Sequence, residues 1–115
     1  MSGITADQIL TKHWDEDLLY GVSFANLLDS GETLTGTPTV TEQTTSVLTI
    51  SGAAVNTAAF TDGDGNTVAI GEGVQFRVED DSDNSNAGST YEILVKCATT
   101  DSNERVVLVK LYVGG

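Results

Sequence analysis

The sequence predicts an all-β protein: a single β-sandwich with a short helical arm in front of it. Three observations carry this prediction. Hydrophobic residues alternate with polar ones from residue 18 to residue 113, the alternating runs are rich in Thr and Val, and Gly, Asn and Asp separate the runs. A period of two is typical of strands that bury one face, and Thr and Val favour strands. A chain of 115 residues is long enough to form one domain with a hydrophobic core.

The N-terminal arm, residues 1–14, carries the helical signals of the chain. Thr5 and Gln8 have the spacing of a capping box, in which each side chain bonds the backbone amide of the other residue. This pattern predicts a short helix over Ala6–His13. Helices shorter than about 12 residues are marginally stable in water, so this helix needs a surface on which to pack.

The apolar face of the predicted helix holds Ile9, Leu10 and Trp14. Tryptophan is favoured as an anchor in protein interfaces, and a short segment of this kind often becomes ordered only on binding. Packing of the same face on the chain's own sandwich is the alternative, and for Trp14 the two alternatives are evenly balanced. We expect Ile9, Leu10 and Trp14 to bind a partner protein.

The first half of the sandwich is expected from three runs separated by Gly, Asn or Asp. Thr and Val dominate the second and third of these runs, and that composition is typical of β-strands. The three predicted strands are Leu18–Phe24, Thr33–Glu42 and Ser46–Val55.

The second half follows a turn rich in Gly and Asp and begins with a short strand over Thr67–Ile70. In Gly73–Glu79, Val, Phe and Val alternate with Gln, Arg and Glu, which predicts a strand with one buried face. Ser89–Thr99 and Glu104–Val113 alternate in the same way. The turn Asp101–Asn103 joins these two runs, so we expect them to form a hairpin.

About seven short strands are therefore expected within residues 15–115. This number and spacing of strands is typical of an antiparallel β-sandwich of immunoglobulin-like type. No internal repeat and no linker divides the run of strands, so the sequence predicts one sandwich domain behind the arm.

Composition excludes several classes of function. The chain has 17 acidic and 5 basic residues and a net charge of −12, which argues against binding to nucleic acid or to anionic membranes. No apolar run approaches the 20 or so residues of a membrane-spanning helix. The single cysteine, Cys97, excludes an internal disulfide and Cys-rich zinc modules.

Catalytic residues are not expected, and neither is a cofactor. His13 is the only histidine, and it lies in the arm, ahead of the sandwich. Cys97 alternates in step with hydrophobic residues, which predicts a buried thiol that behaves as a small hydrophobic side chain. The carboxylates gather in turns, where acidic runs are usually solvated rather than held in a cleft.

One turn offers a weak candidate metal site. Asp62, Asp64 and Asn66 supply oxygen ligands at alternate positions, as in the first half of a calcium-binding loop. The rest of that loop pattern fails, because Thr67 stands where a glycine is required and Gly73 where a bidentate glutamate is required. A plain β-turn is the favoured interpretation, since Gly, Asp and Asn are typical turn residues.

Several strand and turn residues occur in an order that resembles the pattern of a protein family. A Leu-x-Tyr strand leads to a Gly-acid-Thr-aliphatic turn, and later an aliphatic-x-Phe strand, a Gly turn before Tyr, a Thr-rich hairpin and an aliphatic strand follow. This order resembles that of small immunoglobulin-like proteins encoded among the structural genes of tailed bacteriophages, although the Gly-Gly turn usual before the Tyr is replaced here by residues 81–88. The matching segments are Leu18–Phe24, Gly31–Leu34, Val74–Phe76, Gly88–Tyr91, Thr99–Asn103 and Val107–Val113.

The resemblance implies a non-enzymatic component of a phage virion, assembled in the host cytoplasm. It implies an adaptor that joins the tail or connector to a fibre or spike, with a capsid cement or decoration protein as the alternative. The implied partners are other virion proteins, namely the portal or connector, the fibre or the capsid, contacted by multiple copies of the chain. A calcium- or carbohydrate-binding sandwich module is a further alternative, although its loops would need exposed aromatic residues and almost none occur here.

Overall fold

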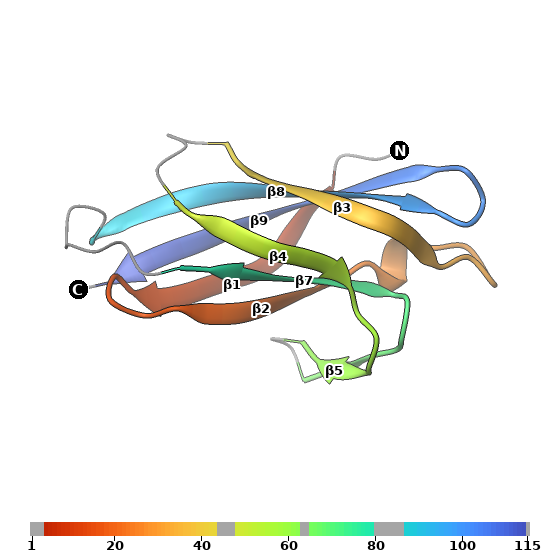
Figure 1. The fold of residues 1–115 in the computed structure, drawn as a ribbon, viewed down its shortest axis with the longest axis horizontal. Coiled ribbons are helices and arrows are strands. Elements are labelled where there is room, and N and C mark those ends of the chain that lie inside the picture. The colour runs from red at the N-terminus through yellow and green to blue at the C-terminus, as the bar shows by residue number, and fades with distance from the viewer. Residues whose placement is uncertain (1–3, 44–47, 63–64, 80–86, 115) are drawn as a thin grey trace.

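The computed structural model describes residues 4–43, 48–62, 65–79 and 87–114, and for residues 4–9 it describes the backbone. Strands make up most of this part of the chain, which measures 44 × 24 × 22 Å along its principal axes (Figure 1). The elements are β1 (Ile4–His13), β2 (Leu18–Ser23), the 3-10 helix η1 (Ala25–Leu27), β3 (Leu34–Glu42), β4 (Ile50–Val55), β5 (Phe60–Thr61), β6 (Thr67–Val68), β7 (Gly73–Val78), β8 (Ser89–Thr99) and β9 (Glu104–Gly114).

The strands form two sheets that pack face to face, together with a small hairpin. One sheet has the order β1-β9-β8-β3, the other has the order β2-β7-β4, and β5 pairs with β6 (Figure 1). Every pairing is antiparallel except that of β1 with β9, which is parallel. The prediction of an all-β sandwich is confirmed.

Alternation along the two longest strands separates core from solvent as the sequence predicts. In β8, the side chain of Val95 is fully buried, whereas that of its neighbour Lys96 is 45% exposed. Cys97 is also buried, as predicted from its place in the same alternation. The core contains these fully buried side chains: Val22, Phe24, Val74, Phe76, Val78, Ile93, Val95, Val109, Leu111 and Val113.

The predicted helix over Ala6–His13 is wrong, because Ile4–His13 forms the strand β1. From Leu10 onward this segment alternates with a period of two: Leu10 and Lys12 are buried, whereas Thr11 and His13 are exposed. Pairing with β9 gives the backbone of the arm hydrogen-bond partners, whereas a helix this short is only marginally stable by itself. Pairing with the edge of β9 therefore outweighs the helix-capping pattern of Thr5 and Gln8.

The hairpin of β5 and β6 covers part of the second sheet, an element that the sequence pattern did not predict as a pair. The ring of Phe60 lies directly over two glycines, where a Cβ atom on Gly21 would come within 2.5 Å of it and one on Gly73 within 2.7 Å. Only glycine leaves room for an aromatic ring this close to a strand. Gly21 and Gly73 therefore form the seat for Phe60.

A buried asparagine holds this hairpin to the sandwich. The Nδ2 atom of Asn56 donates to the carbonyl oxygens of Ala58 and Ala69, and its Oδ1 atom accepts from the amides of Gly71 and Gly73. Asn56 is only 2% exposed, and these four hydrogen bonds satisfy the polar group that burial would otherwise destabilise.

Candidate functional site

The three residues predicted to bind a partner lie where β1 meets the sandwich. Leu10 is 5% exposed and belongs to the core, and Trp14 packs against that core partly buried. The amide of Trp14 donates to the carbonyl of Gly114 at 3.0 Å. Ile9 pairs through its backbone with Lys110, and its side chain lies outside the described part of the structure. Leu10 and Trp14 thus pack on their own sandwich, which was the alternative interpretation.

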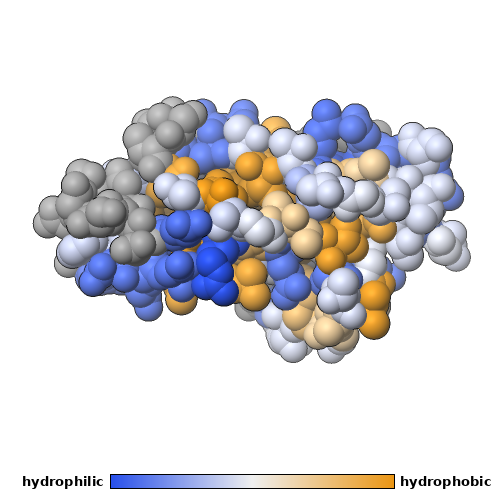
Figure 2. Space-filling model, viewed as in Figure 1, coloured by the Kyte–Doolittle hydropathy of each residue, from blue (hydrophilic) through white to orange (hydrophobic). Residues whose placement is uncertain are grey.

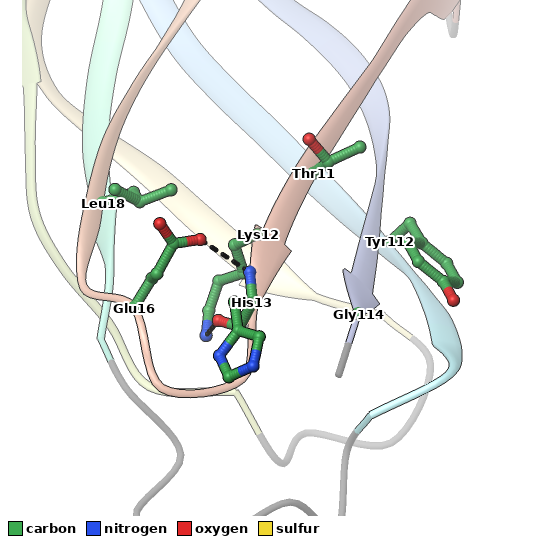
Figure 3. A pocket seen from close by; sticks show the side chains of 7 residues that line it. All are labelled: Thr11, Lys12, His13, Glu16, Leu18, Tyr112 and Gly114. Carbon is green, nitrogen blue, oxygen red and sulfur yellow. Dashed lines mark hydrogen bonds between the residues drawn. The ribbon is translucent and has the colours of Figure 1, made fainter.

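A hollow of about 580 Å³ opens beside the end of β1 (Figure 3). Its polar groups close the turn to β2: the amide of His13 donates to Oε1 of Glu16 at 2.7 Å, and Nδ1 of His13 accepts from the amide of Asp15. The buried ammonium of Lys12 donates to the carbonyl oxygens of His13 and Trp14. These hydrogen bonds engage the groups in the turn itself. Its lining comprises Thr11, Lys12, His13, Glu16, Leu18, Tyr112 and Gly114.

Tyr20 ties β2 to β1 next to this hollow. Its hydroxyl donates to the carbonyl oxygen of Thr11 at 2.7 Å, and its ring packs against Phe76. Burial, reinforced by the nearby carboxylate of Glu16, raises the pKa of Tyr20 to about 12. The hydroxyl therefore stays protonated over the whole range in which proteins are usually studied, and it serves as a donor.

The weak metal candidates lie in the turn between β5 and β6. Oδ1 of Asp62 accepts from the amide of Asn66 at 2.9 Å, and the backbones of the same two residues are hydrogen-bonded. Asp64 lies outside the described residues. In the described part of this turn, Oδ1 of Asp62 stabilises the turn by accepting a hydrogen bond from the backbone amide four residues further on.

A second group of carboxylates was not predicted from the sequence. Asp29, Glu32 and Asp101 bring carboxylate oxygens within 4.8 Å of one another. Nη2 of Arg105 lies 3.6 Å from Oε1 of Glu32 and 3.7 Å from Oδ2 of Asp29. A guanidinium therefore supplies the positive charge at this group, which is an ion-pair network.

The buried member of this network is held by three donors. The carboxylate of Glu32, 2% exposed, accepts from Oγ1 of Thr99 at 2.5 Å, from Nδ2 of Asn103 at 3.0 Å and from the amide of Asp29 at 2.9 Å. The hydrogen bonds from Thr99, Asp29 and Asn103, with a smaller contribution from Arg105, lower the pKa of Glu32 to about 2. Glu32 therefore remains ionised and acts as a structural anchor.

Glu32 also brings together two motif segments that lie far apart in the chain. It belongs to the Gly31–Leu34 turn, and its donors Thr99 and Asn103 belong to the Thr-rich hairpin. The backbones of Thr33 and Thr100 are hydrogen-bonded at the same contact. These two motif segments are thus neighbours in the fold although about 67 residues separate them in the chain.

The solvent side of the four-stranded sheet is the remaining candidate, and we call it the outer face. On it Leu94 of β8 lies opposite Leu108 of β9, both partly exposed, and Tyr112 is 43% exposed. Charged residues flank this apolar centre on both sides. The described side chains on it include Thr39, Thr41, Glu92, Leu94, Lys96, Glu104, Val106, Leu108, Lys110 and Tyr112.

The described side chains of the outer face are balanced in charge, in contrast to the chain as a whole. It carries two acidic residues, Glu92 and Glu104, and two of the five basic residues, Lys96 and Lys110. Glu92 lies opposite Lys110 in the sheet, and Nζ of Lys96 lies 3.4 Å from Oε1 of Glu104. An exposed apolar patch rimmed by polar residues is one feature of protein interaction sites.

The other side of the molecule has a neutral seam where the edge strands β3 and β4 run side by side. Residues 33–61 contain a single charged residue, Glu42, and its side chain is buried. Figure 2 shows hydrophobic side chains gathered on this face of the molecule. Val40 of β3 and Ile50 of β4 are partly buried and pack against the core. Among the described residues, the excess of acidic side chains therefore lies outside both the seam and the outer face.

Comparison of the chain with protein-family models, with curated proteins and with solved structures found no match. None of the helices in the described residues has the length and apolar character needed to cross a membrane. Function is therefore inferred from the residues and the geometry described above.

Proposed function

We propose that this chain is a non-enzymatic structural protein of a tailed-phage virion, an adaptor that joins the tail or connector to a fibre or spike. The single observation that carries a role in assembly is the outer face, where Leu94, Leu108 and Tyr112 are accessible between balanced charges in a chain of net charge −12. The resemblance to immunoglobulin-like phage proteins is the reason for proposing that this assembly is a phage particle. The proposed partners are other virion proteins, and the proposed location is the virion.

The strand order supports an immunoglobulin-like class for the sandwich. Strands β2, β7 and β4 form one sheet, and β3, β8 and β9 are neighbours in the other. This is the partition of the B-E-D and C-F-G strands in immunoglobulin domains, with the first strand of the chain paired to the last. Immunoglobulin-like domains serve many unrelated functions, so the fold supports the proposal without specifying it.

The engagement of the reactive side chains supports a non-enzymatic role. The thiol of Cys97 is buried and lies 3.5 Å from the carbonyl oxygen of Thr35, and burial raises its pKa. A thiol with a raised pKa is a poor nucleophile near neutral pH. Nδ1 of His13 accepts a hydrogen bond within a turn, and the carboxylate of Glu32 holds a hairpin.

Immunogold labelling tests the proposal. Antibodies raised against the purified protein should label intact phage particles from the source of the gene at the junction of head, tail and fibres. Label spread over the whole head would favour the capsid cement alternative. Intact particles that carry no label would overturn the assignment to the virion.

A pair of matched variants tests whether the outer face carries assembly. Leu108→Glu places a charge at the apolar centre of the outer face, whereas Leu19→Glu makes the same change at a 53% exposed leucine on the opposite sheet. Both variants should fold, and Leu108→Glu alone should be lost from particles. Equal incorporation of the two variants would contradict the role of this face.

A further inference from the structure

The central strand of the outer face carries a self-complementary pattern. Glu92, Leu94 and Lys96 alternate along β8 at positions i, i+2 and i+4, so an acid, an apolar residue and a base follow one another on one side of the sheet. The charged pair is exposed, and Leu94 between them is partly exposed. Reversal of the strand about Leu94 exchanges the positions of the acid and the base.

This pattern suits a two-fold interface between identical chains. In an isologous interface the same patch occurs on both sides, so a residue i that contacts j is matched by j contacting i. If β8 of one copy faces β8 of another in the reverse direction, Glu92 of each lies opposite Lys96 of the other, and the two Leu94 side chains meet. Sheets that pack face to face keep their strands within about 30° of parallel or antiparallel, which this arrangement satisfies.

The neighbouring strand extends the contact. Leu108, Val106 and Tyr112 of β9 widen the apolar centre beside Leu94. The side chains of the Lys96–Glu104 ion pair are 45% and 62% exposed. Because an exposed ion pair contributes little to stability, Lys96 can exchange Glu104 for Glu92 of the second copy at little cost in free energy.

The size of the face is close to what a stable contact needs. Strands β8 and β9 have 11 residues each. With about 3.3 Å per residue and four strands about 4.8 Å apart, the sheet presents roughly 700 Å². A standard-size protein interface buries about 800 Å² on each partner, so this face alone suits an interface of moderate strength.

The net charge of the chain and the balanced charges of the outer face favour a second copy of the chain as the partner that packs on this face. Two chains of net charge −12 repel each other wherever their acidic loops approach, and they can approach closely only through a face whose charges cancel. A strongly basic partner would instead prefer the acidic loops to a balanced face.

We propose that two copies of this chain pack through their outer faces, with β8 antiparallel to β8 and Glu92 of each copy opposite Lys96 of the other. This proposal rests on the proposed function, because it identifies a second copy of the chain as the first partner that the outer face binds during assembly. The complementarity is internal to the chain, so the contact forms without any other virion protein.

Charge-swap variants of the full chain, followed by sedimentation velocity over a range of concentrations, test the pairing. The unchanged chain should show a concentration-dependent dimer. Lys96→Glu alone and Glu92→Lys alone each place like charges opposite one another, and each should weaken dimerisation at least tenfold. The double variant Glu92→Lys/Lys96→Glu keeps a self-complementary pattern of opposite polarity and should restore the dimer.

Mixing the two single variants provides a second arm, which separates a loss of charge complementarity from a general loss of association. A chain with two acids on β8 faces a chain with two bases, so the mixture should associate although each variant alone does not. Circular dichroism melts establish that both variants are folded, and Leu19→Glu serves as a matched control that leaves the dimer unchanged. Increased salt should reduce the difference between variants.

A monomeric unchanged chain at all concentrations, or single variants that dimerise like the unchanged chain, would overturn the proposal. Neither result bears on the proposed function, which the particle-labelling experiment tests separately. If the chain is monomeric and Leu108→Glu is still lost from particles, the outer face binds a different virion protein.

Discussion

The carboxylate of Glu32 accepts a 3.0 Å hydrogen bond from the side-chain amide of Asn103, a residue 71 positions further along the chain. Together with the hydroxyl of Thr99, this amide holds the turn that precedes β3 against the hairpin of β8 and β9. The two turns would otherwise be separate exposed loops at one end of the sandwich. A buried carboxylate that accepts three hydrogen bonds is thus one of the contacts that fix this end of the fold.

The first prediction concerns the acid sensitivity that Glu32 confers. Its pKa in the folded chain, about 2, lies below the ordinary value of 4.5, so ionised Glu32 stabilises the fold above that ordinary value. This contribution is lost progressively as the pH falls from about 4.5 to about 2. Glu32→Gln should therefore lower the melting temperature at pH 6 and narrow the gap to the unchanged chain near pH 2, as measured by thermal melts across this range.

Asp15→Asn is the matched control for this experiment, because it removes an exposed carboxylate from a turn outside the network. It should leave the melting temperature at pH 6 nearly unchanged. Parallel curves for Glu32→Gln and the unchanged chain at every pH would show that Glu32 is not the group responsible.

The second prediction tests the seat of Phe60. Gly21→Ala introduces a Cβ atom 2.5 Å from the ring of Phe60, and the overpacking should cost about 1–3 kcal/mol in the free energy of unfolding. In a chain that already carries Phe60→Ala the clash is gone, so the same substitution should cost close to nothing. Urea denaturation of the double-mutant cycle measures the difference, and additive costs would contradict the contact.

The third prediction tests whether the N-terminal arm belongs to its own sandwich. Leu10→Ala removes a core side chain and should cost about 2–4 kcal/mol in the free energy of unfolding. Thr11→Ala, at the exposed position next to it, should change the free energy by less than about 0.5 kcal/mol. If both variants melt like the unchanged chain, the arm does not pack on the sandwich in the isolated protein. Binding of the arm to a partner protein would then be the favoured interpretation.

The fourth prediction tests the register of β8. Val95→Asp buries an unpaired charge in the core and should cost at least about 3 kcal/mol, enough to unfold much of the population. Lys96→Asp changes an exposed side chain with one surface ion pair, so its cost should stay near 1 kcal/mol or below. Similar denaturation midpoints for the two variants would show that the register is wrong.

The fifth prediction concerns calcium. Since Oδ1 of Asp62 already accepts a hydrogen bond from Asn66, calcium should raise the stability only slightly. A dissociation constant near 1 mM would give about 1.4 kcal/mol at a tenfold higher concentration. A larger gain in melting experiments, abolished by Asp62→Ala, would instead establish a calcium site in the turn between β5 and β6.

Local patterns were sufficient to predict most of the strands. The run Ser89–Thr99 was predicted with the bounds of β8, and Gly73–Glu79 differs from β7 by one residue. In these segments the alternation is strict and a single face is buried, so burial and sequence period agree. The prediction of a helix in the arm failed because the local signal favours a helix, whereas the arm pairs with the edge of β9, about 100 residues away in the chain.

The contacts that matter for function depend on topology rather than on local pattern. Alternation predicts that Lys96 is exposed and that Val95 is buried, but it does not reveal that β8 and β9 are the two central strands of one sheet. Glu32 stands in a turn among many acidic residues, and its role becomes visible only once Thr99 and Arg105 are placed beside it. Long-range pairing of this kind is not encoded in any short window of sequence.

The parallel pairing of the first and last strands has a mechanical consequence. Ile4 lies beside Val107 and His13 beside Gly114, so the two ends of the described chain lie at opposite ends of this strand pair (Figure 1). Tension that pulls the ends apart acts along both strands and loads their hydrogen bonds in shear, all at the same time. A force that opens the β8–β9 hairpin from its open end would instead break its bonds one after another. The sandwich is therefore built to resist stretching between its termini more strongly than it resists peeling.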